Sequence, residues 1–173
     1  MIIELKQTTN VSADRLWQVF GEQYPDISKW SRGVYASKPR DGIAPNGAPF
    51  LGRICETSFG KLTETIERYE PGQRAITYLV KGEKMPPFVK RMENNWHFRD
   101  LGNGSSEIAM RLNGKLSFPF NILMGWMMKL QLKKDLATNI EDLIYFAENE
   151  RPHPKKDQAD ASPKARKARE AFV

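Results

Sequence analysis

The sequence predicts an α+β fold, in which a curved antiparallel sheet of six to seven strands wraps around one long C-terminal helix. Residues 119–149 have Gly125 as their only internal glycine, and their apolar side chains recur three or four positions apart, as on one side of an α-helix. At 1.5 Å per residue such a helix runs about 45 Å, enough to cross the whole sheet. Most of the chain before it alternates between apolar and polar residues, which is typical of strands. The apolar positions of the helix are Leu123, Trp126, Met127, Leu130, Leu136, Ile140, Leu143, Ile144 and Ala147.

The first strand and two short helices are expected before residue 31. Residues 2–9 alternate as a half-exposed strand does. Ser12 is a suitable N-cap for a helix that should stop near Gly21. A second short helix is predicted over 25–30, with Pro25 in its first turn and Trp30 at its end.

Six more strands follow. They are predicted at 32–38, 52–58, 61–70, 73–81, 88–99 and 105–116. The connections after the second of these are too short for crossover helices, so the sheet should be antiparallel. The loop 39–49 contains three prolines and two glycines and is either an entrance flap over a cavity or a plain surface excursion.

Alternation within four consecutive strands predicts which residues face inward. A slip of one residue in any strand would exchange its two faces. The predicted inner positions are Leu62, Glu64, Ile66, Ile76, Tyr78, Val80, Met92, Asn94, Trp96, Phe98, Ile108, Met110 and Leu112.

Charge and composition change sharply near residue 150. The chain carries a formal charge of +6, and residues 151–173 hold seven Lys or Arg against three acids. We therefore divide the chain into a domain, 1–149, and a basic tail, 150–173, which is expected to be mobile. The alternative for the tail is a basic helix over 163–172 that lies on a partner or an anionic surface. No nucleic-acid binding is expected of the nearly balanced core.

Several classes of site are excluded by the residue counts. A single cysteine, Cys55, allows no intramolecular disulfide, and His97 and His153 are the only histidines. We expect no metal site and no cofactor. Since no stretch approaches eighteen uninterrupted apolar residues, we expect a soluble, cytoplasmic protein.

The order of elements resembles the helix-grip fold of the START-like (SRPBCC) superfamily, and its polyketide cyclase/dehydrase-like branch in particular. The segments that carry the resemblance are 11–17, 27–30, 52–53 and 60–64, within residues 1–149. The chain departs from the plant hormone-receptor and allergen branch, because its turn at 59–61 is too short for that branch's glycine-rich loop. The resemblance implies a helix-grip fold. It also implies a cyclase-like activity, as one of the functions of the superfamily.

A sheet curled around a helix would enclose a cavity with mostly apolar walls and a few polar groups. Such a lining is typical of sites for small hydrophobic ligands. We therefore expect binding of a lipid-like or aromatic molecule, by a carrier or sensor; the alternative is a filled core. The predicted ligand-binding residues are Trp30, Ile66, Ile76, Met92, Asn94, Trp96, Met110, Leu123, Trp126, Met127 and Leu130.

Glu64 and Tyr78 are the candidate catalytic residues. Desolvation would raise the pKa of Glu64 unless Tyr78, Asn94 or Arg53 compensates its charge. An acid/base pair of this kind could serve a cyclisation or dehydration, with Tyr78 donating a proton to a carbonyl oxygen. The alternative is a buried glutamate whose hydrogen bonds are satisfied by its neighbours. Whether the protein is an enzyme therefore stays open, and an adaptor acting through the basic tail is the third hypothesis.

The start of the long helix has more apolar residues than one face needs. Phe120, Met124 and Met128 could contact a membrane surface, helped by lysines that follow. Weak contact with a membrane or anionic surface is thus a hypothesis for residues 118–134 and for the tail. The alternative is packing under the loop 44–50. The lysines are Lys129, Lys133 and Lys134.

Overall fold

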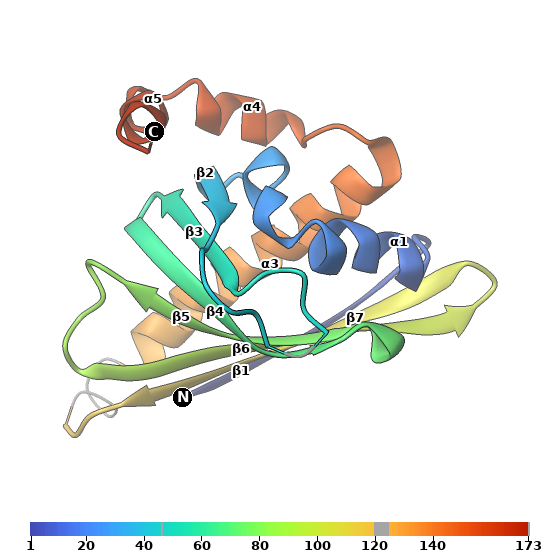
Figure 1. Ribbon diagram of the computed structural model, residues 1–173, viewed down its shortest axis with the longest axis horizontal. Coiled ribbons are helices and arrows are strands. Elements are labelled where there is room, and N and C mark those ends of the chain that lie inside the picture. The colour runs from blue at the N-terminus through green and yellow to red at the C-terminus, as the bar shows by residue number, and fades with distance from the viewer. Residues whose placement is uncertain (46, 120–124, 173) are drawn as a thin grey trace.

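In the computed structural model, which describes residues 1–45, 47–119 and 125–172, seven strands form one antiparallel sheet. The sheet order is β1-β7-β6-β5-β4-β3-β2, and the sheet curves so that its concave face receives the long helix (Figure 1). This confirms the predicted α+β fold. The strands are β1 (Ile2–Thr9), β2 (Val34–Pro39), β3 (Gly52–Thr57), β4 (Gly60–Glu70), β5 (Ala75–Gly82), β6 (Val89–Gly102) and β7 (Ser105–Leu116).

The strand register brings the predicted inner residues together in rows across the sheet. Tyr78 pairs with Ile66 on one side and with Asn94 on the other, and Asn94 pairs with Leu112. All the predicted inner positions are buried except Leu62, which is partly buried. The parity prediction is therefore correct, because side chains that alternate along a strand must reach opposite faces.

Two short helical segments join β1 to β2. The first consists of α1 (Ala13–Trp17) and a π turn, η1 (Gln18–Glu22), and the second is a 3₁₀ helix, η2 (Tyr24–Lys29). Ser12 caps α1, with its side chain accepting a hydrogen bond from the backbone N–H of Arg15. The helical segment formed by α1 and η1 ends at Glu22, one residue past Gly21. Gly21 packs closely on Trp17, since a Cβ atom at Gly21 would lie 2.6 Å from the Trp17 ring. A short 3₁₀ turn, η3 (Pro71–Gln73), connects β4 to β5.

The long helix α3 (Gly125–Asn149) lies along the concave face of the sheet (Figure 1). Its second half buries the predicted residues Leu136, Ile140, Leu143 and Ala147. No described helix is long and apolar enough to cross a membrane.

The predicted face is wrong in the first half of α3. Trp126, Met127 and Leu130 are 65%, 50% and 62% exposed. At about 100° per residue, Met127 and Leu130 lie about 180° and 120° around the helix from Leu136. Trp126 lies about 80° to one side of Leu136, and Met128, which is partly buried, about 80° to the other. Predicted Leu123, with Phe120 and Met124, lies outside the described residues.

The expected mobile tail is instead two helices packed on the edge of the sheet formed by β2 and β3 (Figure 1). These are α4 (Pro154–Asp160) and α5 (Pro163–Glu170). Lys156 is 1% exposed, and its Nζ donates to the backbone oxygen of Val34 at 2.8 Å and pairs with Asp160 at 2.7 Å. Lys164 Nζ donates to the backbone oxygen of Ser58 at 2.6 Å. A helix was the alternative considered for 163–172, but its contacts are with this chain.

Candidate functional site

A cavity of about 560 Å³ lies between the concave face of the sheet and α3. This volume is within the range of sites for small molecules. Its walls are mainly apolar, with side chains from β3 to β7 on one side and from α3 on the other. The apolar wall residues include Cys55, Leu62, Val80, Val89, Met92, Trp96, Leu112, Met128, Leu132 and Leu136.

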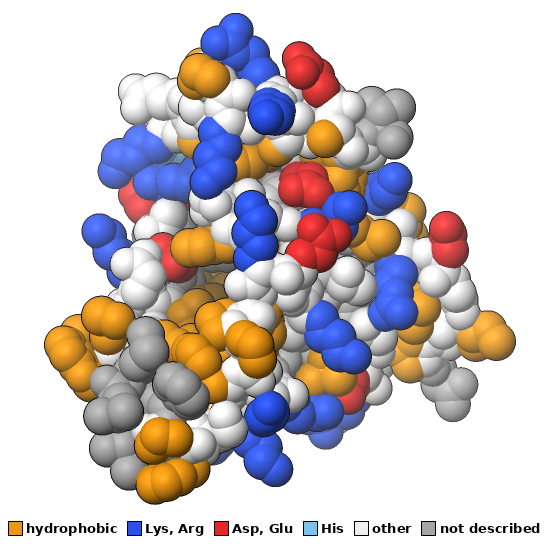
Figure 2. All heavy atoms as spheres, turned by 90° about the vertical axis from the view of Figure 1, so that its left-hand side faces the viewer, with side chains coloured by type: hydrophobic (Ala, Val, Ile, Leu, Met, Phe, Trp, Pro, Cys, Tyr) orange, Lys and Arg blue, Asp and Glu red, His pale blue; other side chains and the backbone are white. Residues whose placement is uncertain are grey.

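The rim of the cavity includes the turn between β3 and β4, the loop between β5 and β6, and the first half of α3. Exposed Phe59 and Lys84 contribute from the two connections. Figure 2, which looks at the end of the molecule where these segments lie, shows hydrophobic side chains gathered there. None of the described residues of the loop 39–49 lines the cavity, so this described part of the loop does not act as an entrance flap over it.

One end of the cavity holds a buried ion pair between neighbouring strands. Arg53 Nε donates to Glu64 Oε2 at 2.7 Å, and the Tyr24 hydroxyl donates to the same oxygen at 2.7 Å. Arg53 Nη1 also donates to the backbone oxygen of Tyr24 at 2.7 Å. Burial alone would lower the pKa of Arg53, but the negative charge of Glu64 raises it above its ordinary value. The compensating charge for Glu64 is therefore Arg53.

Tyr78 and Asn94 are cross-strand neighbours beside this ion pair and face the same cavity. Burial, reinforced by the negative charge of Glu64, raises the pKa of Tyr78 above its ordinary value. The phenol is therefore protonated at neutral pH and can donate a hydrogen bond. Asn94 is 6% exposed, and its Oδ1 atom has no hydrogen-bond partner among the described residues.

Cys55 also lines the cavity, 1% exposed. Burial, with the negative charge of Glu64 adding to it, raises the pKa of Cys55 to about 12. A thiol with this pKa carries almost no thiolate at neutral pH, so Cys55 is not an activated nucleophile.

Polar contacts close the cavity where the segment before β2 meets α3. The Ser31 hydroxyl donates to Asn139 Oδ1 at 2.6 Å. Arg32 donates from its backbone N–H to Asp142 Oδ2 and from Nε to Asp142 Oδ1, both at 2.8 Å. Asp142 has no exposed surface, so this ion pair holds α3 firmly against the segment before β2.

The structure divides the sequence-predicted site residues into three groups. Glu64, Tyr78, Met92, Asn94 and Trp96 line the cavity. A second group is buried in the core outside the cavity lining: Trp30, Ile66, Ile76 and Met110. Of the predicted helix residues, Trp126, Met127 and Leu130 lie on the surface, and Leu123 is outside the described residues.

The helix residues that do line the cavity were not among the predicted ligand-binding residues, although Leu136 was predicted on the apolar face of the helix. They include Met128, Leu132, Leu136 and Asn139. The stripe through Leu136 and Ile140 continues by turns of 3.6 residues to Leu132 and Met128, but apolar residues on the other sides of the first half left the choice of face open. Tyr24 was missed also, since nothing in the local sequence shows that its hydroxyl reaches β4.

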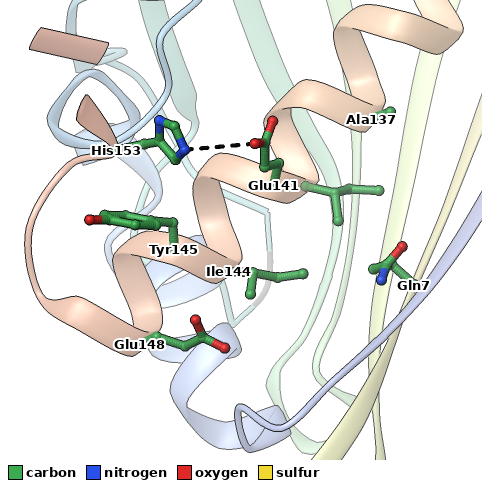
Figure 3. Close-up of a pocket in the computed structure, with 8 residues that line it drawn as sticks. Gln7, Ala137, Glu141, Ile144, Tyr145, Glu148 and His153 are labelled. Atoms are coloured by element: carbon green, nitrogen blue, oxygen red, sulfur yellow. Dashed lines mark ion pairs between the residues drawn. The ribbon is translucent and has the colours of Figure 1, made fainter. Parts of the chain in front are cut away.

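A second, smaller hollow of about 340 Å³ lies farther along α3, beside β1 (Figure 3). His153 Nε2 lies 3.7 Å from Glu141 Oε1, and the His153 ring lies against Tyr145 with centroids 4.8 Å apart. Glu141 also pairs with Arg32 at 3.1 Å. The part of the chain that the structure describes has no group of three or more His, Cys, Asp or Glu that could hold a metal ion.

Comparisons with known proteins identify a family and several similar folds. The sequence model of the family described as polyketide cyclase/dehydrase and lipid transport matches residues 2–144. No curated protein matches the sequence.

Among solved structures, a START superfamily protein from Mycobacterium smegmatis has a TM-score of 0.66 at 14% identity, covering 86% of this chain and 98% of that one. The Zhui aromatase/cyclase from a Streptomyces species has a TM-score of 0.66 at 12% identity, covering 87% and 94%. Norcoclaurine synthase from Thalictrum flavum has a TM-score of 0.63 at 15% identity, covering 87% and 95%. These similarities show the fold.

Proposed function

The chain belongs to the polyketide cyclase/dehydrase and lipid transport family, and on this premise we propose that it binds a small hydrophobic ligand as a carrier or sensor. The ligand would lie in the cavity between the sheet and α3. The observation that carries the proposal is the size of this space, about 560 Å³ with mainly apolar walls. A fully packed protein interior leaves no void of this size.

The filled-core alternative accounts for only one end of the interior. There the ring centroids of Phe20 and Trp96 lie 4.5 Å apart, and those of Phe20 and Phe98 lie 5.5 Å apart. Beyond this aromatic cluster, Val80, Met92 and Leu132 face the open volume. An apolar guest there would replace water against these walls, which is favourable.

The contacts of Glu64 support binding more than catalysis. One of its oxygens accepts both from Arg53 and from the Tyr24 hydroxyl, each at 2.7 Å. A carboxylate engaged in this way holds η2 to the sheet and anchors the polar end of the cavity. We therefore assign Glu64 and Arg53 a structural role in the carrier or sensor.

Filling the cavity from the helix side tests this function. Leu132→Trp would project an indole into the volume, whereas Leu130→Trp, on the exposed side of the same helix, serves as the control. Native mass spectrometry of each purified protein, with and without added naphthalene-type probes, measures bound mass. We expect wild type and Leu130→Trp to bind and Leu132→Trp to bind at least tenfold more weakly. Equal binding by all three would contradict the proposal.

The second candidate function is a cyclase or dehydratase, favoured by a protonated Tyr78 facing the cavity. Such a phenol can donate to a ligand carbonyl oxygen, with Glu64 as the partner carboxylate. One of the similar solved structures is an aromatase/cyclase. Incubation with a poly-β-ketone thioester tests this function: wild type should accelerate its cyclisation, and Tyr78→Phe should abolish the acceleration. If wild type gives no acceleration, the enzymatic function is rejected and the carrier or sensor function is the one that remains.

We also propose that the ligand enters from an anionic membrane surface. Phe118, Trp126 and Leu130 are 78%, 65% and 62% exposed, and the last two lie on the first half of α3, which also contributes Met128 and Leu132 to the cavity. Exposed Lys129, Lys133 and Lys134 accompany them on α3, and Figure 2 shows lysines or arginines beside the hydrophobic side chains. Apolar side chains next to cations suit an interface of anionic lipids.

A further inference from the structure

Two acceptor oxygens on opposite walls of the cavity have no donor among the described residues. They are Asn94 Oδ1, on β6, and Asp135 Oδ2, on α3. Asn94 is 6% exposed and lies in the row of inward side chains between Tyr78 and Leu112. A buried acceptor without a partner is destabilising, so a guest that donates to it is favoured over one that does not.

The cations that line the interior are already paired. Arg53 pairs with Glu64 at 2.7 Å, and Arg32 pairs with Asp142 and Glu141. Lys84, the other cation of the lining, is exposed, and its side chain lies over the turn at Gly60. A carboxylate carried to the depth of the cavity would therefore lose its hydration without gaining a free cation, and it would meet Asn94 Oδ1, an acceptor that repels it. Trp96 Nε1, an unpartnered neutral donor of the same lining, could replace one lost hydrogen bond but not the hydration of the charge.

From these two observations we infer that the ligand is an uncharged apolar molecule whose buried end carries a hydroxyl or N–H group that donates to Asn94 Oδ1. A molecule with a terminal carboxylate is selected against. This inference rests on the proposed function and adds the chemical class of the ligand. Tyr78, next to Asn94, offers a phenol proton to an oxygen on the same end of the guest, so a hydroxyl can both donate and accept there.

Three matched probes test this class: naphthol, its methyl ether, which lacks the donor, and naphthoate, which is anionic. Binding of each is measured by isothermal titration calorimetry at neutral pH to wild type, Asn94→Leu and Asn95→Leu. Asn95 is the control because it follows Asn94 on the same strand and bonds to Thr77 at 2.8 Å, outside the cavity lining. Thermal unfolding of each variant establishes that it is folded.

We expect wild type to bind naphthol about threefold to tenfold more tightly than the ether, the usual contribution of one hydrogen bond. Naphthoate should bind more weakly than naphthol. The ratio of the affinity for naphthol to the affinity for the ether should fall to about one in Asn94→Leu. The same ratio should keep its wild-type value in Asn95→Leu.

The outcomes distinguish a failure of the proposed ligand class from a failure of the proposed binding function. If naphthol and the ether bind wild type equally, if their ratio survives Asn94→Leu, or if naphthoate binds best, the ligand class is overturned while hydrophobic binding stands. If none of the three probes binds, both are overturned. The comparison in wild type needs no variant, so a failure of Asn94→Leu to fold leaves the test decisive.

Discussion

Arg53 Nε lies 2.7 Å from Glu64 Oε2 across neighbouring strands, and their side chains are only 1% and 10% exposed. The pair closes the polar end of the cavity and ties η2 to the sheet through Tyr24. Its energetic role differs from that of the surface ion pairs, because removing one partner leaves a charge in a poorly solvated place.

Breaking this pair should be costly, whereas replacing both partners should not be. Arg53→Met leaves Glu64 without its cation, and we expect the free energy of unfolding to fall by about 3–5 kcal/mol. The double variant Arg53→Met, Glu64→Leu should recover most of this loss. Urea unfolding of the three proteins measures the effect. A double variant as unstable as Arg53→Met would contradict the reasoning.

Cys55 should be almost inert toward thiol reagents in the folded protein. Its pKa rises from 9.0 to about 12 through burial, so at pH 8 its thiolate fraction should be about a thousandfold lower than that of a free thiol. Reaction with Ellman's reagent should be very slow in buffer and complete within seconds in denaturant. Because the chain has one cysteine, the signal belongs to Cys55 alone. Rapid modification of the native protein would show that this side of the cavity opens readily.

Docking of α4 should depend on the protonation of Lys156. Burial lowers the pKa of Lys156 from its ordinary value of 10.5. The folded state then binds fewer protons than the unfolded state between the lowered pKa and 10.5, so stability rises with pH across that window. Wild type should therefore gain stability relative to Lys156→Met as pH is raised toward 10.5. Urea unfolding at several pH values measures the difference, and a constant difference would count against the prediction.

Removing the exposed apolar side chains should weaken binding to anionic vesicles. Trp126→Ser combined with Leu130→Ser should lower the affinity for phosphatidylglycerol vesicles at least tenfold, since each buried apolar side chain contributes about 1.5–3 kcal/mol. Added salt should weaken wild-type binding because it screens the lysines. Sedimentation with vesicles measures both effects. Leu101→Ser is the matched control, because Leu101 is 46% exposed near the end of β6. Equal sedimentation of wild type and the double variant would contradict membrane contact through these apolar side chains.

By itself the sequence determined the architecture and the inner face of the sheet. Strand alternation has a period of two, so placing Glu64, Tyr78, Asn94 and Trp96 inside required only the boundaries of each strand. The second half of α3 was predictable from the helical period instead, because its apolar residues occupy a single stripe.

Only the tertiary structure decided which side of the first half of α3 meets the sheet. Apolar residues surround the helix there, so periodicity favours no face, and Met128 and Leu132 line the cavity while Trp126 and Leu130 remain exposed. The same holds for the Tyr24 hydroxyl, which donates to Glu64 from η2, and for the helices that replace the expected mobile tail. Each depends on contacts between residues far apart in the chain, which local pattern does not reveal. Arg53 was among the candidate partners of Glu64, and the register of β3 and β4 decided between the candidates.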